Sequence, residues 1–585
     1  MNTRRSATAA LYIPLPLWLL LAFGVVSLVV WGAVALGGLA AGTPITSNPV
    51  TVVLGLAMGT VTWPGSWGWV VLVVELGVLV GLGVVVARVR GRRGGKTSVD
   101  RSARSMGHPA DLTPYSADGV AASAQRLRPG GVDLANPDEH GVLIGRTVVG
   151  RKDFRSSWED TIVEIWGPRT GKTTSQAVPA IVAAPGAVLA TSNKRDLHDA
   201  TRGVRELVGK AWLFDPQDIV GLPEPEFWVN PLDTVTGPRE ASELVAHFVA
   251  GSTSPDAKKD SYFDTEGENL LSYFFLAAAR SGKDITAAYH WAADSRNREP
   301  AEILRDAGDI VASKLAGIVE LPEKQREGVY ASALRLLKCL EDARVLKWVT
   351  PPTSWPEYAD RPAEAPTIPQ FDAKSFLQTR DTLYLLSKEG EGSASPLVAA
   401  LTFAVLVAGE QLGRELPGAR LDPPLLCVLD EAANVCRIRQ LPNLYSHFGS
   451  RGMLVMTILQ SWEQGVEAWG KSGMQKIWDS ANVRVYGGGV ADADFLDRLA
   501  RLVGRDDELR WSRSYDRNGG SSRSVSPQRE RILDVEHLAK LPRGRAVVVA
   551  SGVPATMVEP VPWMAGPRAG EIRLSLATYD PGARN

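Results

Sequence analysis

The chain has 585 residues and a formal net charge of −1, so it is too long for one ordinary hydrophobic core. Residues 1–100 hold seven Lys and Arg against two Asp and Glu, which leaves about −6 on residues 101–585. This balance excludes a globally basic nucleic-acid-binding domain, and any such contact must come from a local patch. The three cysteines, Cys339, Cys427 and Cys436, are widely spaced, which argues against a disulfide framework or a zinc site and suits a reducing cytosol.

Two long apolar segments stand near the N-terminus, at residues 11–39 and 67–89. Each exceeds the roughly 20 apolar residues that cross a membrane. A cleaved signal peptide is the alternative for the first segment, because Arg4 and Arg5 precede it. That segment is too long for a signal sequence, however, and a second one follows. Basic residues flank both outer ends, so the sequence predicts a two-helix transmembrane anchor over residues 1–95 with both ends in the cytoplasm.

Glu75 is the one charged residue between Trp67 and Ala87. A charge within a membrane span is costly, and it therefore indicates a functional residue. A polar contact between the two helices, or with a neighbouring subunit, explains it equally well.

Residues 96–140 are rich in Arg, Gly, Ser, Pro and Asp, which predicts a linker or a loosely structured lead-in. The first part of a nucleotide-binding domain is expected over residues 141–236. Apolar runs at residues 186–192 and 211–216 predict buried strands. Their spacing, with a helix between them, predicts a parallel sheet with right-handed crossovers.

The stretch after Trp166 has the features of a phosphate-binding loop. Residues 160–165 before it predict a strand, and residues 175–181 after it predict a helix, which is the context that gives such a motif meaning. Free amides at a helix start attract anions, and the helix dipole adds to this attraction. The expected nucleotide-binding residues are Gly167, Pro168, Arg169, Thr170, Gly171, Lys172, Thr173 and Thr174.

Within this loop, Lys172 is expected to reach the terminal phosphates of ATP, and Thr173 is expected to hold Mg²⁺. The usual pattern places four residues between the first glycine and the Gly-Lys pair, whereas Gly167 and Gly171 have three between them. Either the loop is one residue shorter, or Trp166 stands where the first glycine would be. A chance Gly-Lys-Thr-Thr in an ordinary loop is the alternative interpretation.

The character of the sequence changes over residues 237–355, where apolar residues recur at helical spacing and strand-like runs are absent. This pattern predicts an all-α domain inserted in the nucleotide-binding domain. The second part of that domain is expected over residues 356–555, followed by a C-terminal tail at 556–585. Within it, the polar residues 509–531 predict a mobile surface excursion, for which a solvated loop is favoured over a DNA contact. Further strands are predicted at 382–386, 454–461, 482–489 and 545–550, and a helix at 397–409.

Two more predicted strands end in residues suited to nucleotide hydrolysis. Leu425 to Leu429 is an apolar run that leads into Asp430 and Glu431. In open parallel sheets the carboxyl ends of the strands bind the ligand. Asp430 is therefore expected to support Mg²⁺, and Glu431 to polarise the attacking water. Gln460 ends the next strand, where it can contact the γ-phosphate or the water; a polar residue that simply caps the strand is the alternative.

These residues resemble the type IV secretion coupling protein family, the conjugative DNA transfer ATPases of the TraG and TraD type. The strongest segment is Leu429 to Val435, and it continues through Ser450 to Met453 and Leu459 to Ser461. Asp215-Pro216, Asn230 to Leu232 and Leu541 to Gly544 match weaker family blocks.

The resemblance implies an α/β fold: a RecA-like P-loop nucleotide-binding domain with an inserted all-α domain and an N-terminal two-helix transmembrane hairpin. It also implies ATP and Mg²⁺ as cofactors and a homo-hexameric ring. In such rings an arginine of one subunit completes the site of its neighbour. Arg451 is the candidate for that catalytic role beside Glu431 and Gln460; a structural ion pair is the alternative.

The implied function is that of a membrane-anchored ATPase that couples a relaxase–DNA substrate to a type IV secretion channel and drives conjugative DNA transfer. The expected partners are single-stranded DNA with its relaxase, the channel components and the membrane. The expected location is the bacterial cell membrane, multi-pass, with the motor domain in the cytoplasm. The alternatives are an ATPase that recruits protein effectors, a double-stranded DNA translocase, and a docking platform that binds nucleotide but hardly turns it over.

Overall fold

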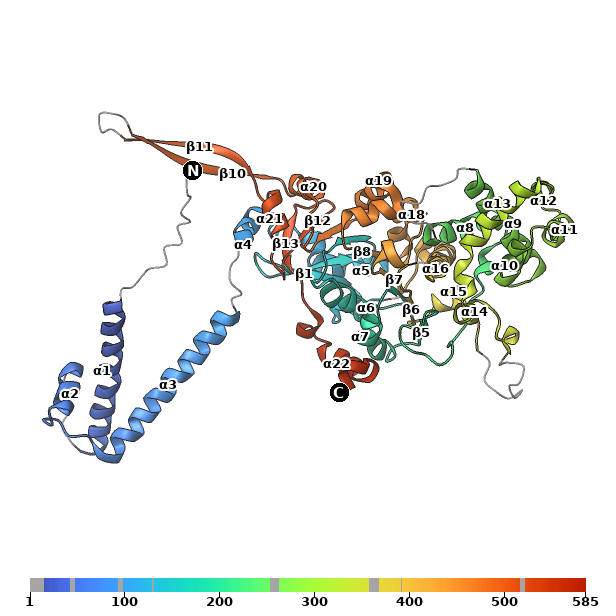
Figure 1. Cartoon of the computed structure of the whole chain (residues 1–585). Helices are drawn as coiled ribbons and strands as arrows, with labels where there is room; N and C mark the ends of the chain where they lie inside the picture. Colours follow the sequence, from blue (N-terminus) through green and yellow to red (C-terminus); the bar gives the residue numbers. More distant parts are fainter. Residues whose placement is uncertain are drawn as a thin grey trace. The chain divides into compact units, whose positions relative to one another are not determined.

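The computed structural model describes residues 15–42, 48–92, 98–128, 131–252, 262–356, 368–390, 392–515 and 521–584. The chain divides into two compact units, Met1–Lys96 and Thr97–Asn585 (Figure 1). The first unit is helical, with α1 (Leu15–Ala40), α2 (Pro49–Ala57) and α3 (Gly65–Arg92). The second unit is built on a large mixed sheet.

In the first unit, α1 and α3 pack closely where glycines remove side-chain bulk. A Cβ on Gly37 would lie 2.8 Å from the Cα of Gly68, and a Cβ on Gly32 would lie 2.1 Å from Oε1 of Glu75. Small residues of this kind let helix backbones approach. The carboxylate of Glu75 therefore lies at the contact between the two helices, as one of its two interpretations requires.

The described residues contain one helix that is long and apolar enough to cross a membrane, α16 (Ser395–Glu415), and 67% of its apolar window is buried within the protein. It is a core helix of the second unit. In the first unit, the apolar stretches found among the described residues are Val26–Ala40 of α1 and Gly65–Gly81 of α3, and neither covers the full length of its helix. The transmembrane hairpin therefore stays a prediction.

The main sheet of the second unit has eleven strands in the order β2-β1-β13-β12-β9-β3-β8-β7-β4-β6-β5. The seven strands from β9 to β5 are parallel, and the other four join them as an antiparallel extension. The mixed α/β fold is as predicted. The strands are β1 (Gly141–Thr147), β2 (Asp153–Ser157), β3 (Ile162–Ile165), β4 (Val188–Ser192), β5 (Ala211–Phe214), β6 (Thr382–Leu386), β7 (Leu425–Leu429), β8 (Met453–Leu459), β9 (Val483–Tyr486), β12 (Ala546–Ala550) and β13 (Thr556–Glu559).

Helices cover both faces of this sheet, because successive residues of a strand point to opposite sides. In β7, Leu426 and Val428 belong to the same hydrophobic cluster as residues of α6, α7 and α22, whereas Cys427 belongs to a second cluster that includes residues of α16, α18, α19 and α20. Both faces are buried, so the parallel strands read as continuous apolar runs. The helices that flank the sheet are α5 (Ala117–Leu127), α6 (Val178–Ala183), α7 (Asp196–Arg205), α17 (Ala432–Val435), α18 (Leu441–Phe448), α19 (Trp462–Ser480), α20 (Ala493–Val503), α21 (Val535–Ala539) and α22 (Ala569–Tyr579).

All the regular elements described between β5 and β6 are helices, and they gather at one end of the second unit (Figure 1). Their apolar residues, such as Leu270 and Phe274, belong to the same hydrophobic cluster as one face of the sheet. The boundaries of an inserted domain stay a prediction. The helices are α8 (Pro238–Ser252), α9 (Phe263–Ser281), α10 (Ile285–Ala293), α11 (Glu299–Asp306), α12 (Ala312–Val319), α13 (Glu323–Leu336), α14 (Ala343–Val349) and α15 (Ala373–Phe376).

Residues 96–140 are not a loosely structured linker where the structure describes them. They form α4 (Ser98–Ser102) and α5, and bury Val99, Met106 and Val120 in the core of the second unit. The Ser116 hydroxyl accepts a hydrogen bond from the Gly119 amide at 3.1 Å, which is an N-cap that starts α5. The irregular spacing of the buried residues hid this packing from pattern analysis.

Two predictions near the C-terminus are also wrong. Residues 556–585 are not a tail, because they supply β13 to the sheet and α22 to its face. The Ser575 hydroxyl of α22 donates to the Asp199 carbonyl at 2.7 Å. Residues 509–531 are not a loop without regular structure, since most of them lie in an antiparallel pair of strands, β10 (Arg505–Tyr515) and β11 (Ser521–Arg531), that forms a separate sheet.

Arg205 connects parallel strands near their amino ends, and its replacement tests that role. Its guanidinium is buried and donates to Thr382 Oγ1 and to the carbonyls of Ala184, Gly186 and Arg380 at 2.7–2.9 Å. Replacing Arg205 by Ala leaves these acceptors unpaired, so we expect a loss of about 3 kcal/mol or more in unfolding free energy. The matched control Arg239→Ala removes a side chain that is 83% exposed and should cost under about 0.5 kcal/mol. Equal thermal unfolding midpoints for the two variants of the purified chain would contradict this role.

Candidate nucleotide-binding site

The predicted site residues come from three adjacent parallel strands. β8 pairs with β3 on one side and with β7 on the other. Their carboxyl ends therefore meet at one edge of the sheet, which is where ligands bind in open α/β folds. This edge brings together Lys172 after β3, Asp430 and Glu431 after β7, and Gln460 after β8.

The loop from Gly167 to Lys172 presents free backbone amides. The Thr170 hydroxyl donates to the Gly167 carbonyl at 2.5 Å, and Arg169 and Gly171 have φ values of +59° and +101°. Within the described chain, the amides of residues 169–172 donate no hydrogen bond to another residue. A turn with consecutive free N–H groups at a helix start is an anion site.

The helix after the loop begins with a π-helical segment, η4 (Thr173–Ala177), which continues into α6. Such π segments are rare and are found often at functional sites. Gln176 is buried in η4, and its side-chain amide donates to the Ile144 carbonyl of β1 at 2.9 Å. This bond fixes the helix start, and with it Lys172 and Thr173, to the sheet.

Lys172 is held by both acids of the β7 edge. Its Nζ lies 3.1 Å from Asp430 Oδ1 and makes a short ion pair with Glu431 Oε1. The Gln460 side-chain amide donates to the same Glu431 oxygen at 2.6 Å. The side chains of Asp430 and Glu431 are 5% and 6% exposed. Four residues from three strands thus form one buried polar cluster.

Burial governs the electrostatics of this cluster. Burial raises the pKa of Asp430 to about 6; Lys172 opposes that shift, and Glu431 adds to it. Burial alone would lower the pKa of Lys172, but its interactions with Asp430 and Glu431 outweigh that effect and raise the pKa above its ordinary value. Two acids this close in a low-dielectric site can both be ionised only with a cation beside them, and in this structure Lys172 is that cation.

The residues present fit a magnesium nucleotide. Glu431 Oε2 is buried without a hydrogen-bond partner, and the Thr173 hydroxyl makes no bond within the described chain. No described group of three or more His, Cys, Asp and Glu could cage a metal, but Mg²⁺ on a nucleotide uses one or two protein ligands with phosphate and water. Of the five described non-glycine residues with positive φ, Arg169 and Glu431 lie here, as strained residues at functional sites do.

Trp166 does not take the place of the close-packed glycine of the loop. The Trp166 amide donates to the Leu459 carbonyl at 2.9 Å and so extends the β3–β8 ladder. Its indole is buried and donates to Glu164 Oε2 at 2.7 Å. A Cβ on Gly167 would lie 2.1 Å from the carbonyl oxygen of Gly489, so Gly167 is the position that only glycine can occupy. Of the two alternatives, these contacts favour a loop that is one residue shorter.

Two features beside this loop are not predicted from the sequence. Glu164 is fully buried on β3, and its only sequence signal is an acid inside an apolar strand. The second is Gly487 to Gly489, where a Cβ on Gly487 would lie 1.8 Å from the Trp166 ring. Three consecutive glycines after a strand are the signal that could have identified it.

Arg451 is not brought to this site. It precedes the first residue of β8, whereas Gln460 follows the last. Seven strand residues place them on the order of 20 Å apart, at opposite edges of the sheet. Arg451 donates to the Ala419 carbonyl at 3.3 Å. A role at the nucleotide site of its own subunit is excluded by this distance.

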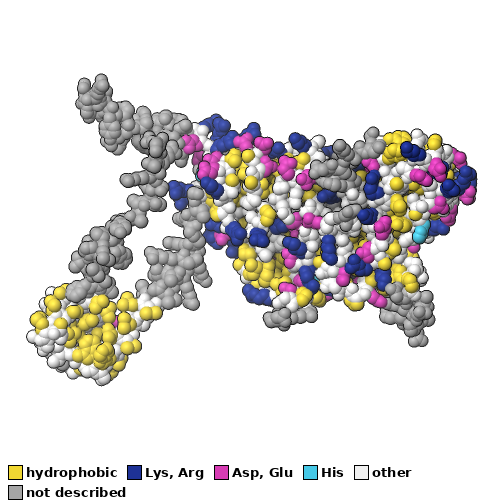
Figure 2. Space-filling view, in the orientation of Figure 1, with side chains coloured by type: hydrophobic (Ala, Val, Ile, Leu, Met, Phe, Trp, Pro, Cys, Tyr) yellow, Lys and Arg dark blue, Asp and Glu magenta, His cyan; other side chains and the backbone are white. Residues whose placement is uncertain are grey.

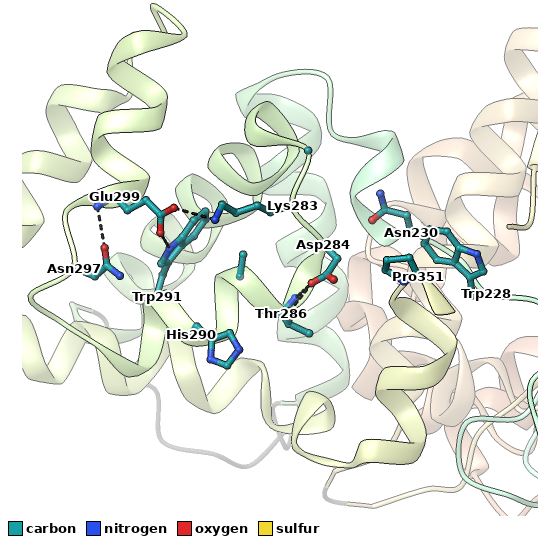
Figure 3. Close-up of a pocket in the computed structure, with 12 residues that line it drawn as sticks. Trp228, Asn230, Lys283, Asp284, Thr286, His290, Trp291, Asn297, Glu299 and Pro351 are labelled. Carbon is teal, nitrogen blue, oxygen red and sulfur yellow. Dashed lines mark hydrogen bonds and ion pairs between the residues drawn. The ribbon is translucent and has the colours of Figure 1, made fainter. Parts of the chain in front are cut away.

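A separate pocket of about 530 Å³ lies among the helices after β5 and contains none of the predicted site residues (Figure 3). Lys283 pairs with Glu299 at 3.0 Å, and Glu299 also accepts from the Trp291 indole at 2.8 Å. The polar groups that line this pocket are thus largely paired with one another. The other lining residues are Trp228, Asn230, Gly282, Asp284, Thr286, Ala287, His290, Asn297 and Pro351.

Glu164 makes the stability of this site pH-dependent. Burial raises the pKa of Glu164 from 4.5 to about 8, and the Trp166 indole opposes that shift. The folded state therefore holds a proton that the unfolded state releases, and stability falls as pH rises from 4.5 to about 8, by up to about 1.4 kcal/mol per unit. Replacing Glu164 by Gln should reduce the change of the thermal unfolding midpoint with pH over this range. Glu302→Gln, at an exposed position, should leave that pH dependence unchanged. An unchanged pH profile for Glu164→Gln would contradict the shift.

A family model described as the TraM recognition site of TraD and TraG matches residues 424–543. A search of curated proteins gives no match. Among solved structures, the chain is similar to the unbound bacterial conjugative coupling protein TrwBdeltaN70, with 18% identity, a TM-score of 0.52, and coverage of 72% of this chain and 89% of that one.

Two nucleotide complexes of the plasmid coupling protein TrwB are similar at the same coverage, 72% of this chain and 89% of theirs. The complex with the GTP analogue GDPNP has 17% identity and a TM-score of 0.51. The complex with ADP and Mg²⁺ has 16% identity and a TM-score of 0.50. The matched family segment and the shared α/β fold together confirm the predicted resemblance of this chain to the type IV coupling proteins.

Proposed function

We propose that this chain is a membrane-anchored, Mg²⁺-dependent ATPase that couples a relaxase–DNA substrate to a type IV secretion channel and drives conjugative DNA transfer. The observation that carries the ATPase part is the buried cluster of Lys172, Asp430, Glu431 and Gln460 beside free loop amides. The family match supports the conjugative part.

In this proposal the loop amides and Lys172 bind the phosphates, and Thr173 and Asp430 hold the metal. When bound, Mg²⁺ supplies positive charge that offsets the charge of the phosphates. Glu431 orients and polarises the attacking water, and its free Oε2 is the atom available for that task. Gln460 donates to Glu431 in this structure, and in the proposal it contacts the water or the γ-phosphate when nucleotide is bound. Lys172 must leave Glu431 before either acid can act.

The mixture of positive and negative side chains on the surface supports a local DNA contact and not a broad one. On the face of the second unit in Figure 2, Lys and Arg are interspersed with Asp and Glu. We propose a homo-hexamer in which Arg451 acts on the site of a neighbouring subunit, since its own site is at the opposite sheet edge. The first unit would anchor this ring in the bacterial cell membrane, with the second unit in the cytoplasm and its helices α8 to α14 recognising the relaxase–DNA cargo.

Two substitutions test the ATPase. Lys172→Ala removes the phosphate contact and should abolish both nucleotide binding and ATP turnover, while the protein stays in the membrane fraction. Glu431→Gln keeps the shape and removes the base, so it should retain binding and reduce turnover by about 10²-fold or more. Turnover by purified full-length protein and plasmid transfer by cells are the readouts. Normal plasmid transfer by cells that carry Lys172→Ala would contradict the proposal that ATP hydrolysis drives transfer.

The cargo is tested with the same purified protein. Stimulation of ATP turnover by single-stranded DNA supports conjugative transfer. Stimulation by double-stranded DNA alone favours a duplex translocase, and stimulation only by a partner protein favours effector secretion. Nucleotide binding without turnover in any assembled state favours a docking platform.

A further inference from the structure

The three glycines after β9 lie directly against the phosphate loop. The Gly167 amide donates to the Gly488 carbonyl at 2.9 Å. A Cβ on Gly489 would lie 2.7 Å from Cγ2 of Thr170 and 3.2 Å from the Cα of Gly167. Because these contacts leave no spare space, a shift of the loop on binding phosphate must displace Gly488 and Gly489 as well.

The same glycines contact a second segment on their other side. Gly488 has φ +83°, and a Cβ there would lie 3.3 Å from both Cβ and O of Leu541. Next to it, the Tyr486 hydroxyl donates to the Leu538 carbonyl at 3.1 Å. The backbone from Leu541 then turns into β12 through Arg545, whose amide donates to the Pro542 carbonyl at 3.2 Å. A displacement of Gly488 therefore acts on the segment from Leu541 to Arg545.

Arg545 in turn holds the first described helix after the first unit. Its Nε and Nη2 lie 2.7 and 3.4 Å from the two carboxylate oxygens of Asp100 in α4. The pair is largely buried, at 16% and 8% exposure, and a bidentate Arg–carboxylate pair fixes orientation as well as distance. Beyond it, the Gly107 amide donates to the Ala555 carbonyl at 2.8 Å. Residues 98–107, near the start of the second unit, are thus docked on the rest of that unit.

We propose that this path couples occupancy of the phosphate loop to the docking of residues 98–107. It runs by contact from Gly167 through Gly488 to Leu541, along the chain to Arg545, and by the ion pair to Asp100. The inference rests on the proposed nucleotide binding and adds a regulatory connection to it. Glycines with positive φ supply the part of the path that can change backbone conformation. Coupling of this kind is reciprocal, so a change in docking of α4 also changes nucleotide affinity by the same factor.

Hydrogen exchange of the full-length, detergent-solubilised chain tests the coupling, with Mg²⁺-ADP as the probe. In the wild type, ADP should change amide exchange across residues 98–107 by about fivefold or more. Asp100→Asn keeps the side-chain shape but weakens the pair; it should abolish this response and shift the ADP Kd by a similar factor. Restoring the pair in reverse, Asp100→Arg with Arg545→Asp, should recover part of the response. The matched control Glu559→Gln removes an exposed ion pair to Arg151 and should change neither quantity.

The outcomes separate this inference from the function on which it rests. If the wild type binds ADP but residues 98–107 exchange at the same rate with and without it, the coupling is wrong and the ATPase proposal stands. If Asp100→Asn keeps the full response, the path through Arg545 is wrong. Failure of the wild type to bind ADP would overturn the nucleotide site itself.

Discussion

The central constraint in this protein is that two buried acids, Asp430 and Glu431, can both be ionised only with a cation beside them. In this structure the ammonium of Lys172 meets that need, and the same ammonium is the group expected to bind phosphate. The two tasks exclude each other. When Lys172 moves to a phosphate, another positive charge must take its place at the acids, and the nucleotide's Mg²⁺ is suited to do so. In the proposed function, phosphate binding and metal binding are thereby linked by electrostatics.

The sheet makes this arrangement possible. Parallel strands deliver their carboxyl ends to one edge, so residues nearly 300 positions apart come together without long side chains or flexible loops. Burial on both faces removes water from the cluster, which strengthens every charge interaction in it. The antiparallel extension adds a second connection, because β12 joins β9 and leads back through Arg545 to the segment after the first unit. The candidate nucleotide edge and the N-terminal segment of the second unit thus share one framework.

Much of this could be predicted from the sequence, because buried parallel strands are unbroken apolar runs and their polar ends are easily seen. Asp430, Glu431 and Gln460 followed from that pattern. Strand order could not be predicted, and neither could the role of residues 98–140 or 556–579, whose buried residues are scattered among Gly, Pro and Ser. Arg451 was predicted as a catalytic residue from its position in the family pattern alone. Only the length of β8 shows that it lies at the sheet edge opposite Gln460. The sequence leaves open whether Trp166 stands where a loop glycine would be, because the close approach of Gly167 to Gly489 depends on the tertiary structure.

A structure of the full-length chain with Mg²⁺ and a non-hydrolysable ATP analogue tests the central claim most directly. The account predicts that Lys172 Nζ leaves Glu431 and lies within hydrogen-bond distance of the β- or γ-phosphate, with the metal near Thr173 and Asp430. Binding of the analogue elsewhere, or at this edge with the Lys172–Glu431 ion pair intact, would contradict it.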